Sequence, residues 1–352
     1  MRALLLITSA VCALVMAALL VHAPSPAAAC AGLIGSNGAV NLGRTTTLAG
    51  YHEGVEHYVT AFEFQGGGGE FGTLIPLPGV PSKVERGGDW TLQRLERETE
   101  PVGLKALDLE SAGAAQAEVL QQVRIDALDI TVLKGGGPDV ATWASDHGFR
   151  LSPDAPEVLD FYAQRSPIFL AAVFDGEAAA ARGQRVGDGT PVHITIPTTN
   201  PWVPLRILGL GKQPDDRVNA DVFLLTDSKP AILPGTREGL TLAHSEKATD
   251  SLLADLRSDA GGDWVPQSAW LTKLDVNSSA ADLHYDLAVD TTRAHSPSRV
   301  AAGLELPSTP LLEDDGSASP FVSLAVVGIL AVLVALTVLR LQATVGRRAP
   351  RT

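Results

Sequence analysis

Residues 44–77 read RTTTLAGYHEGVEHYVTAFEFQGGGGEFGTLIPL, and this stretch decides the fold. Its first part, residues 44–64, is rich in Thr, Val, Tyr and Phe. The aromatic side chains Tyr58, Phe62 and Phe64 share one parity, which is the period-two pattern of a half-buried strand. We therefore predict one long strand over residues 44–64.

Four consecutive glycines follow that strand, at residues 66–69. They predict a hairpin loop, and residues 71–77 then predict the returning strand. Pro76 and Pro78 would stop it, because proline cannot donate a hydrogen bond to a neighbouring strand. The sequence thus predicts a β-hairpin at the start of the domain.

Later segments mix strands and helices without a regular alternation. Around Ala127 the apolar parity switches from odd to even positions, which predicts a bulge or a break in a strand. Glycine and proline residues frame two short helices, at 138–148 and 153–164, and a third helix is expected to begin at Ser245. Further strands are predicted at residues 168–174, 192–196, 222–225 and 283–287. This mixture predicts an α+β fold with a mainly antiparallel sheet and a few short helices.

Both ends of the chain predict contact with a membrane. Arg2 precedes nineteen uncharged, mostly apolar residues, and three alanines at 27–29 then complete the pattern of a secretory signal peptide over residues 1–29. An uncleaved membrane anchor is the alternative reading of the same segment. Residues 321–339 carry no charge and are long enough, at about 28 Å as a helix, to span a bilayer.

The charges around the second apolar segment predict its orientation. The tail, residues 340–352, holds four arginines and no acidic residue, so the positive-inside rule places it in the cytoplasm. Residues 30–290 would then form an extracytoplasmic α+β domain. Residues 291–320, rich in Pro and Ser, would form an extended stalk between that domain and the membrane.

Composition and charge exclude some classes of protein. The chain has 352 residues, of which 45% are hydrophobic, and this is too apolar for a disordered polypeptide. A net charge of −13 excludes a nucleic-acid binder. Only Cys30 remains after removal of the signal peptide, so no internal disulfide is possible, and whether Cys30 is lipidated stays open.

Candidate chemistry centres on one histidine-rich segment, His52-Glu53-Gly54-Val55-Glu56-His57. A zinc protease needs two histidines four residues apart on a helix, whereas these are five apart. On a strand that spacing predicts opposite faces, although a turn could gather His52, Glu56 and also Glu53 around a metal ion. The candidate metal ligands are His52, Glu56 and His57, and we expect no cofactor.

Other polar features favour surface roles. His193 and His284 fall on the polar parity of their predicted strands, so solvent exposure is expected. The tetrapeptide Gly-Gly-Asp-Trp occurs twice, at residues 87–90 and 261–264. Because the flanking residues do not align, reuse of a local turn device explains the pair better than internal duplication.

Several short segments together resemble a bacterial family known as domain of unknown function 2330. They are Cys30-Ala31-Gly32, the strand around Tyr58, residues 71–78, Gly148-Phe149 through Phe169-Leu170, and Pro204-Leu205-Arg206-Ile207. The resemblance covers most of residues 30–230 and implies an exported, often membrane-tethered protein. It implies no catalytic residue, since the family has no established activity, and members often carry cysteines that this chain lacks.

From these patterns we expect a single-pass cell-membrane protein whose extracytoplasmic domain binds or scaffolds an unidentified ligand or protein partner. The alternative is an extracytoplasmic hydrolase or metal-dependent enzyme.

Overall fold

The computed structural model describes residues 27–28, 32–35, 44–63, 71–99, 119–181, 183, 189–237, 239–292 and 294–307. Most of the expected signal peptide, Cys30, the glycine loop at 66–69 and the apolar segment at 321–339 lie outside these ranges. Inside them, none of the helices combines the length and the apolar character needed to cross a bilayer.

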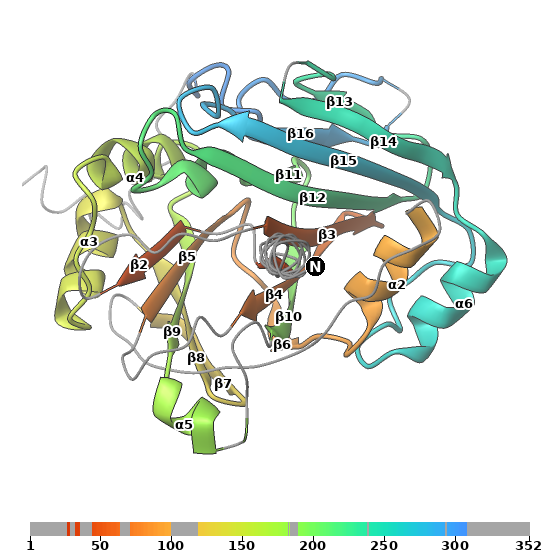
Figure 1. Ribbon diagram of the computed structural model, residues 1–352. Helices are drawn as coiled ribbons and strands as arrows, with labels where there is room; N and C mark the ends of the chain where they lie inside the picture. The colour runs from red at the N-terminus through yellow and green to blue at the C-terminus, as the bar shows by residue number, and fades with distance from the viewer. Residues whose placement is uncertain are drawn as a thin grey trace, which may run out of the picture. The chain divides into compact units, whose positions relative to one another are not determined.

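The largest sheet, which we call sheet A, contains eight strands (Figure 1). Its order is β14-β15-β12-β3-β4-β10-β6, with β1 paired to β3. Neighbours are antiparallel except that β12 and β1 each run parallel to β3. The strands are β1 (Ala27–Ala28), β3 (Arg44–His52), β4 (Val55–Glu63), β6 (Lys83–Arg86), β10 (Gly189–Pro197), β12 (Arg217–Thr226), β14 (Leu240–Lys247) and β15 (Trp270–Ser279).

A second, entirely antiparallel sheet, sheet B, has the order β2-β5-β9-β8-β7. Its strands are β2 (Gly32–Gly35), β5 (Phe71–Leu77), β7 (Val119–Ile125), β8 (Leu128–Lys134) and β9 (Ile168–Phe174). Three short strands form a third sheet in the order β11-β16-β13: β11 (Trp202–Val203), β16 (Leu287–Asp290) and β13 (Ala231–Leu233). The expected α+β fold with mainly antiparallel sheets is confirmed.

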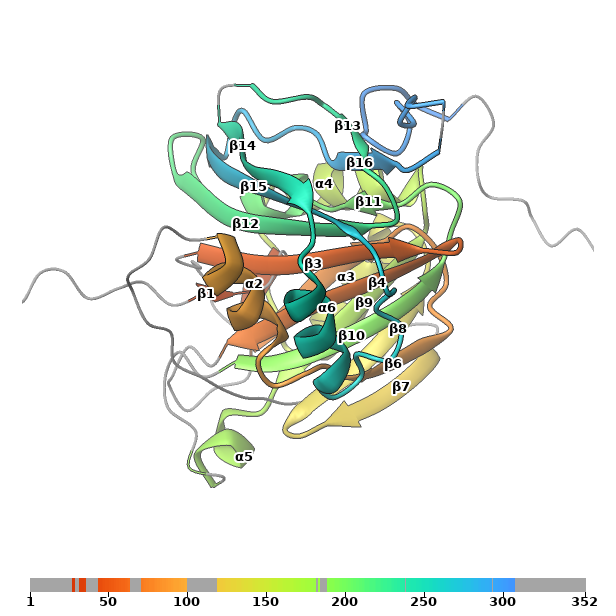
Figure 2. The same cartoon turned by 90° about the vertical axis from the view of Figure 1, so that its right-hand side faces the viewer.

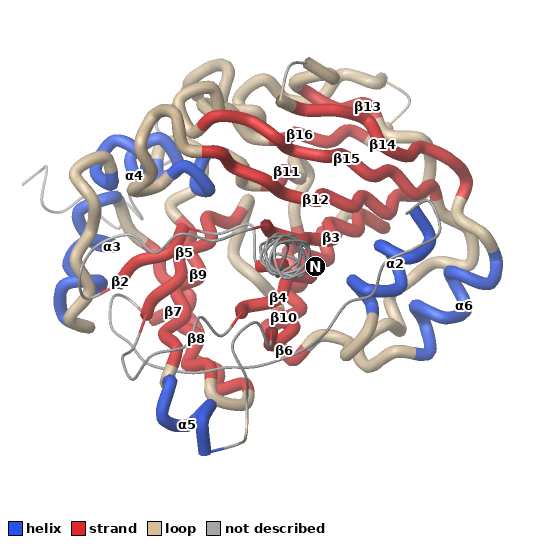
Figure 3. The backbone as a smooth tube through the Cα atoms, viewed as in Figure 1, coloured by secondary structure: helices blue, strands red, loops and turns tan. Residues whose placement is uncertain are grey.

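Helices cover the outer faces of the two large sheets (Figure 3). Apolar residues such as Tyr58 and Leu170 fill the space between sheets A and B. Helices α2 (Thr91–Thr99) and α6 (Asp250–Ser258) cover the other face of sheet A (Figure 2). There they bury Leu48 and Val59. Helices α3 (Gly137–Asp146) and α4 (Ala155–Ala163) cover sheet B. A short helix, α5 (Gly176–Ala181), follows β9, and a 3₁₀ turn, η1 (Arg206–Gly209), follows β11.

The predicted hairpin at the start of the domain is wrong in its position. The chain turns at Glu53 and Gly54, so residues 44–64 do not form one strand, and β4 lies between β3 and β10. Strand β5 belongs to sheet B, where it pairs with β2 and β9 instead of β4. Glu53 and Gly54 both adopt positive φ, at 50° and 82°. A two-residue turn of this kind matches the twist of antiparallel strands, and glycine supplies the second position without strain.

Other predicted elements are confirmed. The break at Ala127 is a turn between β7 and β8, and residues 168–174 form β9 as expected. The two framed helices exist, and Gly148 ends the first one with φ of 72°. The third helix begins later than expected, at Asp250, because the Thr249 hydroxyl accepts a hydrogen bond from the Leu252 amide at 3.2 Å.

The strand expected at residues 283–287 lies further along the chain, at 287–290. Asp286 explains the shift, because its backbone amide donates to the Ala302 carbonyl at 3.0 Å instead of joining a ladder. Its carboxylate accepts from the Leu205 amide, the Tyr162 hydroxyl and Arg165, at 2.7, 2.9 and 2.5 Å. Both oxygens of the buried Asp286 carboxylate therefore accept hydrogen bonds.

The same network holds the start of the segment expected as a stalk. Arg165 donates to the Ala301 carbonyl at 2.7 Å, and Ala301 and Ala302 are buried. Gly303 packs so closely on Phe161 that a Cβ there would lie 2.2 Å from the ring. Residues 301–303 thus pack against α4 and the Arg165–Asp286 pair.

Candidate functional site

The β3–β4 hairpin fixes where the histidine-rich segment points. His52 pairs with Val55, Tyr51 with Glu56, and Gly50 with His57. Paired residues share a face and successive residues alternate, so His52 and His57 face helices α2 and α6. Glu56 faces sheet B. The five-residue spacing did not separate the two histidines, because the turn lies between them and resets the parity.

His57 meets a partner that the sequence analysis placed in solvent. His193 lies on β10, diagonal to His57 on the same face of sheet A, and the two residues are only 3% and 9% exposed. His57 Nδ1 and His193 Nε2 are 3.0 Å apart, so one ring donates a hydrogen bond to the other. The predicted exposure of His193 is wrong, because helices and a loop cover the polar parity of β10.

Three side chains form a row across β4, β10 and β6. They are His57, His193 and Glu85. His193 Nδ1 lies 3.6 Å from the Glu85 carboxylate, which pairs at 2.7 Å with Lys83. Burial lowers the pKa of His57 to about 3 and that of His193 to about 4, so both rings are neutral at pH 7. The neighbouring His193 and His52 lower the pKa of His57 further, whereas the Glu85 carboxylate raises the pKa of His193 in part.

An indole ring closes this row on the helix side. Trp264 stacks on His57 with ring centroids 4.2 Å apart and an angle of 5° between the planes. It occupies the space above Gly50, where a Cβ would lie 2.2 Å from the ring. A small cavity beside it has room for about one water molecule. Its polar side chains are those of His193 and Thr91, and Gly88, Gly261 and Gly262 provide backbone walls.

The two Gly-Gly-Asp-Trp segments meet at this cavity. Asp259 accepts hydrogen bonds from the amides of Asp89 and Trp90, both at 3.1 Å, and from the Thr91 hydroxyl at 2.8 Å. It therefore caps the N-terminus of α2 from another loop. A Cβ on Gly88 would lie 2.1 Å from the Asp259 carboxylate, so close packing accounts for glycine there.

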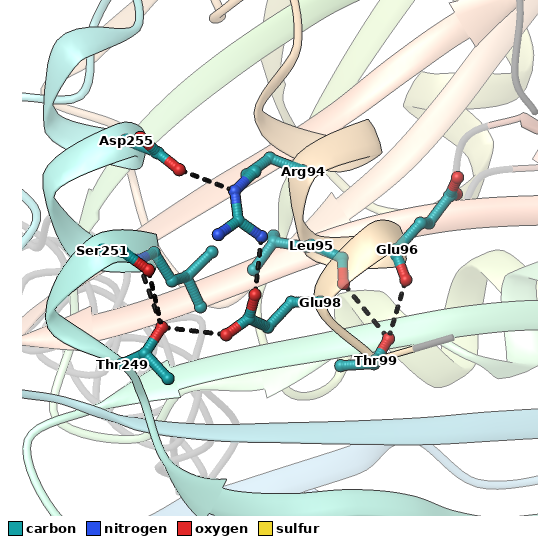
Figure 4. A network of polar contacts seen from close by, with 9 residues as sticks. Arg94, Leu95, Glu96, Glu98, Thr99, Thr249, Ser251 and Asp255 are labelled. Atoms are coloured by element: carbon teal, nitrogen blue, oxygen red, sulfur yellow. Dashed lines mark hydrogen bonds and ion pairs between the residues drawn. The ribbon is translucent and has the colours of Figure 1, made fainter. Parts of the chain in front are cut away.

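Ion pairs also join the two helices that cover the site. Figure 4 shows Arg94 of α2 between Glu98, at 2.7 Å, and Asp255 of α6, at 2.8 Å. Glu98 in turn accepts from the Thr249 hydroxyl at 2.9 Å, next to the start of α6. These contacts fix the helix pair above sheet A.

Glu56 is isolated on the opposite face. It is fully buried, and neither carboxylate oxygen makes a hydrogen bond of normal geometry with a described residue. Burial raises the pKa of Glu56 to about 8, although the Trp202 backbone lowers it in part. The carboxyl group is consequently protonated at neutral pH.

Three further histidines lie apart from this row. His52 Nδ1 is 2.6 Å from the Asp227 carboxylate near the surface. His147 Nδ1 donates to the Trp143 carbonyl at 2.6 Å, and His284 is exposed as expected. Over the described ranges, no three His, Cys, Asp or Glu side chains are grouped so that they could hold a metal ion. The fold thus places Glu56 across the sheet from His52 and His57.

These features define an α+β protein with two packed, mainly antiparallel sheets and a buried, neutral histidine pair. Residues 24–289 match the family described as "Uncharacterized protein conserved in bacteria (DUF2330)", and the chain belongs to this family. The resemblance seen in the short sequence segments is thereby confirmed. No curated protein matches the chain.

Three solved structures show a distant likeness. The crystal structure of baculovirus P35 is 9% identical, covers 70% of this chain and 96% of its own, and gives a TM-score of 0.36. A mutated baculovirus P35 after caspase cleavage is 8% identical, with 72% and 99% covered and a TM-score of 0.36. The caspase-8/P35 complex is 10% identical, with 69% and 92% covered and a TM-score of 0.31.

Proposed function

We propose that this protein is a single-pass, membrane-anchored binding or scaffolding module whose folded domain lies outside the cytoplasmic membrane. The observation that carries the proposal is the uncharged segment 321–339, followed by a tail with four arginines and no acidic residue. The apolar residues after Arg2 support export of the domain. No activity is known for the family to which the chain belongs.

The closed histidine row favours binding at the surface over catalysis at this place. His57 and His193 lie beneath Trp264, and the adjoining cavity has room for about one water molecule. A substrate would need a far larger opening to reach either imidazole. The alternative, a hydrolase or metal-dependent enzyme, draws its support from the Glu85–His193–His57 row, in which a carboxylate lies next to one of two touching imidazoles.

The anchoring is tested on the full chain in bacterial cells. We expect external protease to digest the domain of intact spheroplasts and to leave a membrane-bound C-terminal fragment. Deleting residues 321–352 should release the domain from the membrane. A matched variant that keeps the length but replaces the four tail arginines with glutamine should lose its uniform orientation. Full protection from protease in intact spheroplasts would refute the proposal.

The binding role is tested by comparing the native and denatured masses of the full chain in detergent micelles. An excess equal to an organic ligand or a second protein supports a binding module. A metal-ion excess that a chelator and His52→Ala or His57→Ala remove would instead support the enzyme. A native mass equal to that of the bare chain, for protein purified from its own host, would contradict stable binding.

A further inference from the structure

Residues 259–264, which we call the lid, follow α6 in the connection to β15 and cover the two buried histidines. At one end Asp259 is anchored to the N-terminus of α2 through the Asp89 and Trp90 amides. At the other end Trp264 stacks on His57. Between them Gly261, at φ of 72°, passes so close that a Cβ on it would lie 3.6 Å from His193 Nδ1.

The space beneath the lid accepts neutral imidazoles and has little to stabilise charged ones. The two rings touch through nitrogens 3.0 Å apart, so a proton on each would place two positive charges side by side in a buried site. The charged and titratable groups that act on the pair are Glu85 and Lys83 on β6 and His52 at the end of β3.

These neighbours do not compensate for a second proton. Glu85 is already paired with Lys83 at 2.7 Å, and its distance to His193 is 3.6 Å. In the lid, the Asp259 carboxylate accepts hydrogen bonds from the α2 amides. The lid groups next to the histidines are the Trp264 ring and the Gly261 backbone, and neither carries a charge. The helix layer contributes Leu256 and Thr91 to the cavity, and neither side chain carries a charge.

We propose that residues 259–264 form an acid-released lid, in which protonation of His57 and His193 displaces Trp264 from above Gly50 and opens the cavity. Asp259 stays on α2 and acts as the hinge point. The open state restores water to both imidazoles, so each one there regains an ordinary affinity for protons. This device is independent of the proposed binding function.

The size of the effect follows from linkage. The open-to-closed ratio rises tenfold for each pH unit below about 6.5 for one histidine released, and about a hundredfold for two. Between pH 6.5 and pH 5 the open-to-closed ratio should therefore increase by roughly 250-fold for two released histidines. A rarely open lid at neutral pH would become largely open near pH 5.

The experiment uses the full chain in detergent micelles and measures hydrogen exchange by mass spectrometry from pH 7.5 to pH 4.5, corrected for the intrinsic exchange rate. We expect peptides covering residues 259–264 to lose protection as the pH falls, while peptides from β9 and β12 keep theirs. Unchanged lid protection at pH 4.5 would overturn the proposal, as would simultaneous loss over all these peptides.

Matched variants assign the effect to the pair. His57→Gln with His193→Gln removes both titrating groups, and we expect the pH dependence of lid protection to disappear. His284→Gln removes an exposed histidine and should leave it unchanged. If the double variant fails to fold, imidazole NMR of the wild-type chain decides the matter. The signals of His57 and His193 must then titrate together with lid opening. If these two histidines titrate independently of lid opening, the proposal is overturned.

Discussion

Replacing Glu56 with glutamine should remove a large pH dependence from the stability of this protein. The carboxyl group is fully buried between the two sheets, with its pKa raised to about 8 from an ordinary 4.5. In the unfolded chain it loses its proton above pH 4.5, whereas in the folded chain it keeps the proton until about pH 8. Its contribution to stability is therefore fully present below pH 4.5 and is lost as the pH rises.

The magnitude follows from that difference in pKa. Each pH unit between the two values costs about 1.4 kcal/mol of unfolding free energy, so wild type loses about 3 kcal/mol through this group between pH 5 and pH 7. Glutamine has nearly the same shape and cannot ionise. The stability of Glu56→Gln relative to wild type should therefore rise by about 3 kcal/mol over the same interval.

Urea unfolding of the full chain in detergent, followed by tryptophan fluorescence at pH 5, 6 and 7, measures this difference. Glu177→Gln is the matched control, because Glu177 is an exposed glutamate in the short helix α5. It should change stability equally at all three values. A Glu56→Gln variant whose difference from wild type stays constant across pH would refute the reasoning.

Three further substitutions test the packing around the site. Gly50→Ala places a methyl group in the Trp264 ring and should cost about 1–3 kcal/mol and alter the tryptophan emission. Asp259→Ala removes the cap of α2 and should cost about 2 kcal/mol in urea unfolding, whereas Asp263→Ala should be neutral. Asp286→Ala leaves the buried Arg165 without its carboxylate and should cost about 3–5 kcal/mol, seen as a fall in Tm.

Local signals in the sequence were sufficient to predict elements whose ends are marked by proline, glycine or a change in polarity. Helix α3 was predictable because Pro138 stands in its first turn and Gly148 follows its last turn. Strand β9 was predictable because seven apolar residues stand between Pro167 and Asp175. The tight turn at Glu53 and Gly54 was missed, since the apolar pattern continues on both sides of it. A Gly preceded by a polar residue within that run was the available signal.

The environment of the site depended on contacts that no local pattern encodes. Alternation placed His193 on the less apolar face of β10, but only the packing of α2, α6 and the lid shows that this face is covered. Trp264 reaches His57 across more than two hundred residues of sequence. Likewise, the two Gly-Gly-Asp-Trp copies were visible in the sequence, whereas their meeting at one small cavity depends on the tertiary fold.

Adjacent residues of β4 impose opposite pH dependences, and together they predict an optimum of stability. The folded pKa values of His57 and His193 are lowered, so their contribution is complete above pH 6.5 and is lost as the pH falls. The Glu56 contribution is lost as the pH rises above 4.5. Between pH 4.5 and 6.5 the two histidines outweigh the one carboxyl group, and above 6.5 only the carboxyl group acts. Stability should therefore peak near pH 6.5. In Glu56→Gln, we expect stability above pH 6.5 to stay level instead of declining. An unaltered decline above pH 6.5 in that variant would show that other groups control it.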